Sequence, residues 1–224
     1  MSKTKPIIGI STGDPNGIGV EVILKCFSDK RMFDFMTPVV FSNYELVKAQ
    51  AVHFNLKVGL NSLSDFKNLK SNSLNIYEAS KGKFKLEFGK SNESGGQLSR
   101  ESLTTASSFL KIKKIDALVT APINKKNILH ESFDFMGHTD FLNKTFDGDA
   151  MMFMVSQDLK IALLTEHIPI DKITENISKD LIEKKIKTID MSMKKDFGIQ
   201  RPKIAILSIN PHAGDDGIIG NQDQ

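Results

Sequence analysis

Two histidines follow apolar runs in the same manner. Residues 160–167 read KIALLTEH and residues 203–212 read KIAILSINPH, so His167 and His212 each come just after a run with the composition of a buried strand. In open α/β sheets, ligands bind beyond the carboxyl ends of the strands. Neutral imidazole is a common ligand of zinc and similar divalent ions, and it also serves as a general acid or base. The pattern therefore predicts a metal site or an acid–base site that uses both histidines.

A third histidine lies in residues 136–140, which read MGHTD. In this motif Gly137 would let the backbone approach a ligand, while His138 and Thr139 would offer hydrogen bonds side by side. The alternative is that Thr139 or Asp140 caps a short helix that ends near residue 144. The residues alone leave both interpretations open.

Two further segments have the composition of anion sites. Residues 13–19 read GDPNGIG, and glycines between a strand and a helix let backbone N–H groups approach an anion. The spacing fits neither the dinucleotide fingerprint nor the P-loop, and a tight turn with positive φ explains the glycines equally well. Lys125 falls in the first turn of a helix expected to begin at Pro122, where it would meet a phosphate or a carboxylate, or be solvated.

Alternating strands and helices must position these residues, and the alternation predicts an α/β fold. The expected strands are 6–10, 38–41, 74–77, 117–119 and the run before His212, and the expected helices are 19–25, 43–53, 97–112 and 178–198. Residues 151–155 and 161–164 predict an antiparallel hairpin, and hence a mixed sheet. Residues 60–73 are rich in Asn, Ser and Lys and predict an irregular surface segment.

Composition excludes several classes of function. The 30 basic and 27 acidic residues leave a net charge of only +3, and no stretch interleaves basic and aromatic residues, so nucleic acid is not an expected partner. Cys26 is the single cysteine, which excludes an intrachain disulfide and favours a cytoplasmic protein. The sequence has neither a signal-peptide pattern nor an apolar run of membrane-spanning length.

Taken together, the motifs resemble one family, the 4-hydroxythreonine-4-phosphate dehydrogenases of vitamin B6 (pyridoxine) biosynthesis. The segments that carry the resemblance appear in the family's order along nearly the whole chain: 12–19 (TGDPNGIG), 116–125 (DALVTAPINK), 137–140 (GHTD), 164–167 (LTEH) and 210–214 (NPHAG). The resemblance implies an isocitrate/isopropylmalate-dehydrogenase-like fold with two α/β/α parts. We place the first part, with the glycine-rich loop, at 1–120 and the second, with the substrate and metal motifs, at 121–224.

The resemblance also assigns roles to the histidines. It implies that His138 and Thr139 contact a phosphorylated hydroxy amino acid, that His167 and His212 bind a divalent metal (Zn, Mg or Co), and that NAD or NADP accepts a hydride. From the residues alone, Glu166, Asp215 and Asp216 lie near these histidines in the sequence and would either support the metal ligands or be solvated. The family is implied to be homodimeric and to oxidise 4-phosphooxy-L-threonine to a β-keto acid, which decarboxylates to 3-amino-2-oxopropyl phosphate.

The family's third metal histidine, in a His-Asp-Gln-Gly motif, does not occur in this sequence, which reads NQDQ at 221–224 where the family continues for about another third of its length. We therefore expect a chain without the C-terminal third, with weak metal binding and little or no turnover. The alternatives are a dehydrogenase of another phosphorylated hydroxy acid, an inactive truncated fragment, and a metal-dependent hydrolase, against which the glycine-rich loop weighs.

Overall fold

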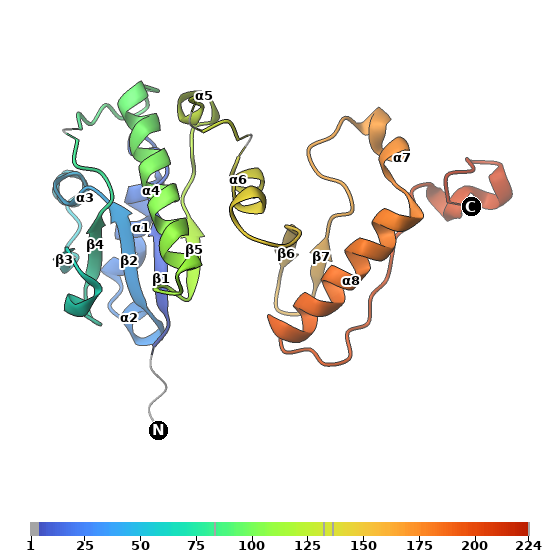
Figure 1. Ribbon diagram of the computed structural model, residues 1–224, viewed down its shortest axis with the longest axis horizontal. Helices are drawn as coiled ribbons and strands as arrows, with labels where there is room; N and C mark the ends of the chain where they lie inside the picture. The colour runs from blue at the N-terminus through green and yellow to red at the C-terminus, as the bar shows by residue number, and fades with distance from the viewer. Residues whose placement is uncertain (1–4, 83, 132, 136, 224) are drawn as a thin grey trace. The chain divides into compact units, whose positions relative to one another are not determined.

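A computed structural model describes residues 5–82, 84–131, 133–135 and 137–223 of the chain (Figure 1). The chain divides into two compact units, Met1–Asp147 and Gly148–Gln224. The first is an α/β unit around a parallel sheet, as the alternation of strands and helices predicts. The second contains a hairpin and a long helix.

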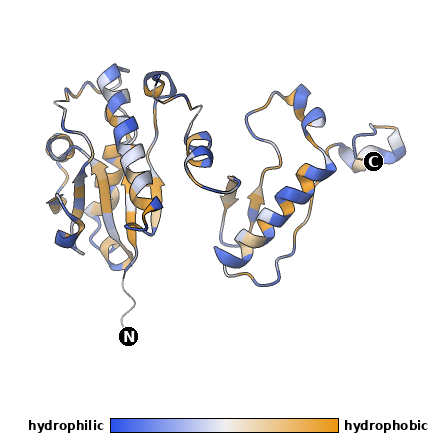
Figure 2. Ribbon diagram, viewed as in Figure 1, coloured by the Kyte–Doolittle hydropathy of each residue, from blue (hydrophilic) through white to orange (hydrophobic). Residues whose placement is uncertain are grey.

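The first unit is built on five parallel strands in the order β3-β4-β2-β1-β5. Their bounds are Ile7–Ser11 (β1), Thr37–Ser42 (β2), Leu60–Leu63 (β3), Leu74–Glu78 (β4) and Ala117–Thr120 (β5). Figure 2 shows that the strands in the middle of this sheet are mostly hydrophobic. Every residue of β2 is buried, so this strand is covered on both faces. Strands of this kind need helices on both sides, because both of their faces must be removed from water.

Helices cover both faces of the sheet. On one face lie α1 (Gly19–Ser28) and α3 (Tyr44–His53), and their buried side chains share one core with Ile10, Val40 and Ile76. On the other face lies α4 (Glu93–Lys111), which packs Ala106 against Val39 and Phe41 and lies in front of the sheet in Figure 1. A short helix, α2 (Met32–Phe35), joins α1 to β2.

Three local predictions are corrected in this unit. Residues 60–63 are not irregular but form the edge strand β3, whose polar Asn61 is held by Asn75 Oδ1 at 2.9 Å. Helix α4 begins at Glu93 rather than at residue 97, because Asn92 caps it by accepting from the Gly95 N–H at 2.8 Å. Pro122 does not begin a helix; α5 is Lys125–Ile128 and is capped by Asn124.

The segment after β5 belongs to the first unit, whereas we expected a boundary at 120/121. A third apolar cluster explains the difference, because Leu103 of α4 packs with Ile128, Phe133 and Phe141. Phe141 lies in α6 (His138–Thr145), and its ring stacks on that of Phe133 with centroids 5.2 Å apart. The aromatic contacts thus hold α5 and α6 against α4, and the division falls after Asp147.

The second unit contains the predicted hairpin, formed by β6 (Phe153–Val155) and β7 (Lys160–Ala162). It is followed by the short helices η2 (Ile170–Lys172) and α7 (Ile173–Asn176), by α8 (Lys179–Lys195) and by the turn η3 (Pro211–Gly217). Ser178 caps α8 as predicted, accepting from the Leu181 N–H at 3.2 Å.

Two expectations for this unit are wrong. Within the described residues the hairpin forms a separate two-stranded sheet, so the mixed sheet that we expected is not formed. The run before His212 is not a strand, because residues 203–209 make no strand pairing and their side chains are exposed. Among the described residues, no helix combines the length and apolar character that crossing a membrane requires.

Candidate functional site

The glycine-rich loop after β1 packs tightly against the chain's own backbone. Gly13 has φ +63°, and a Cβ there would lie 2.1 Å from the Pro122 carbonyl oxygen. A Cβ on Gly19 would lie 2.4 Å from the carbonyl oxygen of Thr12. Both glycines are therefore needed for a turn and for a close backbone approach. Of the two interpretations of this loop, the tight turn is the one that the geometry supports.

The same loop brings Asp14 into a buried polar cluster at the carboxyl edge of the sheet. One carboxylate oxygen of Asp14 accepts from the backbone N–H of Asn16 at 3.0 Å, and the other accepts from the Asn127 amide at 3.1 Å. Asp14 is only 7% exposed. Sequence reasoning missed this cluster, although an Asp two residues before an Asn is the signal of a turn closed by a side-chain carboxylate.

Removing the Asp14 carboxylate should weaken the first unit. In Asp14→Ala, the Asn127 amide and the Asn16 N–H lose their acceptor in a buried setting, which costs about 1–3 kcal/mol. Urea unfolding monitored by circular dichroism measures the loss. Asp14→Asn retains one acceptor oxygen and should lose less. Equal stability of Asp14→Ala and the unchanged chain would contradict the role of this carboxylate.

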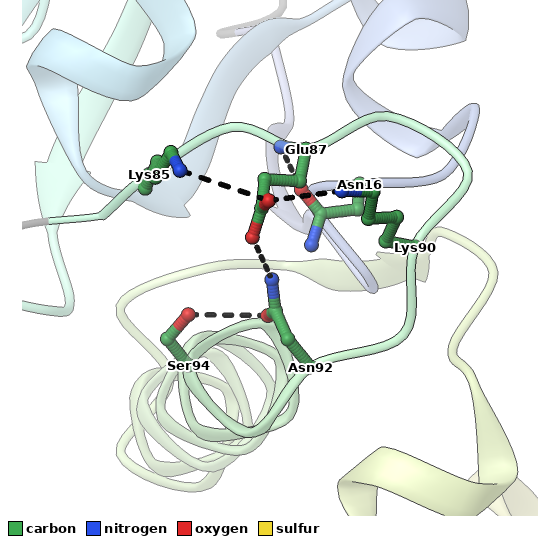
Figure 3. A network of polar contacts seen from close by, with 6 residues as sticks. All are labelled: Asn16, Lys85, Glu87, Lys90, Asn92 and Ser94. Carbon is green, nitrogen blue, oxygen red and sulfur yellow. Dashed lines mark hydrogen bonds and ion pairs between the residues drawn. The ribbon is translucent and has the colours of Figure 1, made fainter.

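A second polar network holds the segment before α4 against the glycine-rich loop (Figure 3). The Glu87 N–H donates to Asn16 Oδ1 at 2.8 Å, and the Glu87 carboxylate accepts from Asn92 at 3.4 Å and pairs with Lys90 at 3.3 Å and Lys85 at 3.8 Å. The hydrogen bond from Lys90, followed by the nearby lysine charges, lowers the pKa of the Glu87 carboxyl. The network thus links the loop after β1 to the N-terminus of α4.

His138 and Thr139 form the first turn of α6 and are both half-buried. Met136, which begins the predicted motif, lies outside the described residues. Gly137 occupies the N-cap position and has no side chain with which to cap the helix. Thr139 and Asp140 lie inside the helix rather than at its N-cap position, and Asp140 pairs with Lys144 at 3.5 Å. The positive end of the helix dipole at this N-terminus favours an anion.

The environment of the His138 imidazole favours its neutral form, which can donate and accept hydrogen bonds. Its Nε2 is buried and has no hydrogen-bond partner among the described residues. Burial lowers the pKa of the His138 imidazole below its ordinary 6.5, because desolvation disfavours the cationic form. The side chain is therefore neutral at pH 7 and offers one donor and one acceptor nitrogen.

This lowered pKa predicts a pH dependence with a definite sign. The unfolded chain protonates His138 near pH 6.5 and the folded chain at lower pH, so stability is full above pH 6.5 and falls as the pH drops toward the folded pKa. NMR titration of the imidazole should give a pKa below 6.5. His138→Gln should remove this part of the pH dependence; an imidazole pKa at or above 6.5 would contradict the burial argument.

Lys125 is not part of the buried polar cluster around Asp14. It begins α5, its side chain is exposed, and the helix is capped by Asn124, which accepts from the Lys126 N–H at 3.0 Å. The solvated interpretation of this lysine fits better than a phosphate contact.

The two strand-end histidines belong to the second unit. His167 follows β7 by five residues, His212 lies in η3, and both are exposed. Their φ angles are +54° and +52°, so both imidazoles project from left-handed turns. The carboxylate of Glu166, beside His167, lies 4.0 Å from the Lys185 ammonium of α8.

The described residues do not complete a metal site. No group of three or more His, Cys, Asp or Glu side chains in the part of the chain that the structure describes could hold a metal ion. Two exposed imidazoles are fewer donors than the three protein ligands usual for catalytic zinc. The donors that the described residues supply are therefore too few for a catalytic zinc site by themselves.

Comparison with known proteins decides the family. The model of the family described as "Pyridoxal phosphate biosynthetic protein PdxA" matches residues 34–224. The chain belongs to this family. Membership in the PdxA family confirms the resemblance. The match contains four of the five motifs and all four predicted site residues, whereas the motif at 12–19 lies before it.

Individual PdxA relatives extend beyond this chain. A Bacteroides thetaiotaomicron protein named 4-hydroxythreonine-4-phosphate dehydrogenase is 35% identical over 226 residues, and the match covers 100% of this chain but 62% of that protein. A Clostridium botulinum protein, whose name proposes a D-threonate 4-phosphate dehydrogenase, is 25% identical over 240 residues, covering 100% and 68%. The crystal structure of a 4-hydroxythreonine-4-phosphate dehydrogenase from Burkholderia phymatum superposes with a TM-score of 0.83 at 26% identity, covering 99% and 68%. This chain thus spans about two thirds of its relatives' length.

Proposed function

We propose that this chain is the substrate-phosphate-binding part, with an incomplete metal donor set, of a dehydrogenase that acts on a phosphorylated hydroxy amino acid. The reaction is oxidation of the secondary alcohol of 4-phosphooxy-L-threonine, with the hydride passing to NAD or NADP and a proton released. The β-keto acid formed then loses carbon dioxide to give 3-amino-2-oxopropyl phosphate. Membership in the PdxA family and the names of the relatives support this proposal.

The first turn of α6 is the observation that carries the proposal. It combines a helix N-terminus whose N-cap residue is a glycine, a buried imidazole nitrogen of His138 that has no hydrogen-bond partner among the described residues, and the neighbouring hydroxyl of Thr139. A phosphate oxygen needs several donors that converge on one point, and the helix dipole adds a favourable field there. These groups would bind and orient the substrate through its phosphate, which is the part that does not react.

His167 and His212 remain our proposed metal ligands. Because the described residues supply no third donor, they do not fit a metal by themselves, and we assign no catalytic step to a metal in this chain. A bound nicotinamide cofactor would supply the hydride acceptor. The glycine-rich loop faces the chain's own carbonyls rather than an open cradle, so we assign it no cofactor phosphate. The proposed homodimer of the whole enzyme stays a prediction.

A second candidate substrate carries the same phosphate group that α6 is proposed to bind. The name of the Clostridium botulinum relative points to D-threonate 4-phosphate, which carries its phosphate at the same carbon but lacks the amino group. The phosphate contacts proposed for α6 serve both compounds equally. The choice between them therefore depends on groups that recognise the amine or the second hydroxyl.

Calorimetric titration of the 224-residue chain with 4-phosphooxy-L-threonine, D-threonate 4-phosphate and unphosphorylated 4-hydroxy-L-threonine tests the proposal. Binding of either phosphorylated compound, with no binding of 4-hydroxy-L-threonine, is the expected result. Tighter binding of the threonate would select the second substrate. Equal binding of 4-hydroxy-L-threonine and its phosphorylated form would exclude phosphate recognition by this chain.

A further inference from the structure

Arg100 of α4 uses only part of its guanidinium within the fold. Its Nη1 donates to the backbone carbonyls of Asn127 at 3.2 Å and Ile128 at 3.1 Å, the last two residues of α5, which lies beside the N-terminal end of α4 in Figure 1. An arginine offers five N–H donors in one plane. Nε and Nη2 of Arg100 have no hydrogen-bond partner among the residues that the structure describes, and neither atom is fully buried. Both nitrogens are therefore available to a ligand that arrives from solvent.

The positive charge of Arg100 has no carboxylate beside it. The side chain is half-buried, yet no ion pair among the described residues includes it. The carboxylate of the next residue, Glu101, accepts instead from the Gln97 amide at 2.8 Å. The two carbonyls of α5 carry only partial negative charge. A half-buried guanidinium in this setting favours an anion as its further partner.

Two contacts fix the direction of α4 relative to α6. Leu103 of α4 and Phe141 of α6 belong to one apolar cluster. Further along both helices, the Lys111 ammonium of α4 donates to the Thr145 carbonyl of α6 at 3.4 Å. The residue numbers of both helices increase from the first contact to the second. The two helices therefore run in the same direction.

Arg100 and His138 lie at the same end of this helix pair. Each comes one helical turn before the residue that its helix contributes to the shared cluster. Side chains on an α-helix lean toward its N-terminus, so both side chains extend further toward that end. The position of Arg100 Nη1 agrees with this direction, since it lies 3.3 Å from the place where a Cβ on Gly96 would stand. The guanidinium and the buried Nε2 of His138 thus belong to one end of the pair.

We propose that Arg100 is a further phosphate-binding residue, which joins His138 and Thr139 in binding the phosphate of the phosphorylated hydroxy acid. This inference rests on the proposed function, because it takes the first turn of α6 as the phosphate site. A guanidinium binds two oxygens of one phosphate with parallel N–H groups. Nη1 would stay on the carbonyls of α5, while Nε and Nη2 would bind two phosphate oxygens.

Capping of α5 explains only one nitrogen of Arg100. A lysine at the same position could donate to the same two carbonyls, because its ammonium carries three donors. It could not form the planar, two-point contact with phosphate. The capping role and the phosphate role are therefore separated by Arg100→Lys, which keeps the charge and the cap but removes the fork.

Calorimetric titration of the 224-residue chain with 4-phosphooxy-L-threonine makes the first measurement. Arg100→Lys should bind about tenfold more weakly than the unchanged chain, because a two-point contact is replaced by a single charge. Its urea unfolding curve should stay close to that of the unchanged chain. Arg31→Lys is the matched control, since it makes the same exchange at an exposed site in the same unit, and its affinity should change by less than about twofold.

NMR of the arginine Nε–H groups makes the second measurement and requires no folded variant. The chain has three arginines, Arg31, Arg100 and Arg201, so the signals can be assigned one by one. Titration of the unchanged chain with 4-phosphooxy-L-threonine should shift the Arg100 signal and the His138 imidazole signal over the same range of concentration. The signals of the other two arginines should not move.

The outcomes separate this inference from the proposed function. If Arg100→Lys bound as tightly as the unchanged chain, or if the His138 signal moved without that of Arg100, the role of Arg100 would be overturned while the proposed function stood. A shift at Arg100 without one at His138 would overturn the joint site and place the anion at α5. Absence of binding by the unchanged chain would overturn both.

Discussion

Gly96→Ala should destabilise the first unit by about 3 kcal/mol or more, although alanine is the better helix former by about 1 kcal/mol. Gly96 lies inside α4, where a Cβ would fall 1.7 Å from the Asn127 carbonyl oxygen. That oxygen is backbone and accepts from Arg100 at 3.2 Å, so it cannot move without breaking the contact between α4 and α5. The variant therefore also shifts the Asn127 amide away from Asp14.

Gln97→Ala is the matched control for this prediction. Gln97 lies one position further along the same helix and its side chain is exposed. Both variants therefore place an alanine in α4, but only the one at residue 96 meets the Asn127 carbonyl. The free energy of unfolding of Gln97→Ala, measured by urea denaturation, should change by less than about 0.5 kcal/mol. If Gly96→Ala were as stable as Gln97→Ala, the close packing of α4 on α5 would be wrong.

Removing the two side chains of the α6 turn should have the second large effect. The double variant His138→Ala/Thr139→Val should bind 4-phosphooxy-L-threonine at least about tenfold more weakly, because hydrogen bonds to a charged group are worth about 1.5–3 kcal/mol each. Calorimetric titration at fixed ionic strength measures the change. The circular dichroism melt should stay close to that of the unchanged chain, since both side chains are only half-buried.

Lys125→Ala supplies the control for the binding experiment. It removes one exposed positive charge from the same unit, outside the proposed phosphate contacts. Binding should fall by less than about threefold, as expected for a screened surface charge. A larger effect of Lys125→Ala than of the double variant would move the phosphate site from α6 to α5.

The parallel sheet of the first unit could be predicted because the local sequence pattern is enough to identify most of its strands. Runs such as residues 38–41 are apolar on both faces, and capping residues such as Asn43 mark where helices begin. Strand β3 could not be predicted, because its polar Asn61 makes its hydrogen bonds to Asn68 and Asn75 at a sheet edge, which the local sequence pattern does not reveal. The contact of Phe133 and Phe141 with Leu103 of α4, inside the compact unit that ends at Asp147, likewise has no local signal in the sequence.

Some features of the candidate site could be predicted from the sequence and others could not. The motif at His138 and Thr139 was recognisable from residue types, and its location at a helix N-terminus agrees with an anion site. The Asp14–Asn127 contact joins residues 113 positions apart and has no local signal. The strand expected before His212 has the right composition, but composition does not provide the neighbouring strand with which it must pair.

The most direct test of the account measures substrate binding and turnover on the same sample of the 224-residue chain. NAD, a divalent metal and 4-phosphooxy-L-threonine are added while NADH formation and the His138 imidazole signal are followed. The account predicts that the substrate shifts the imidazole signal while NADH formation stays at background, because the proposed phosphate contacts lie in α6 and the described residues supply no third metal ligand. Robust metal-dependent NADH formation, or a His138 signal unaffected by saturating substrate, would contradict it.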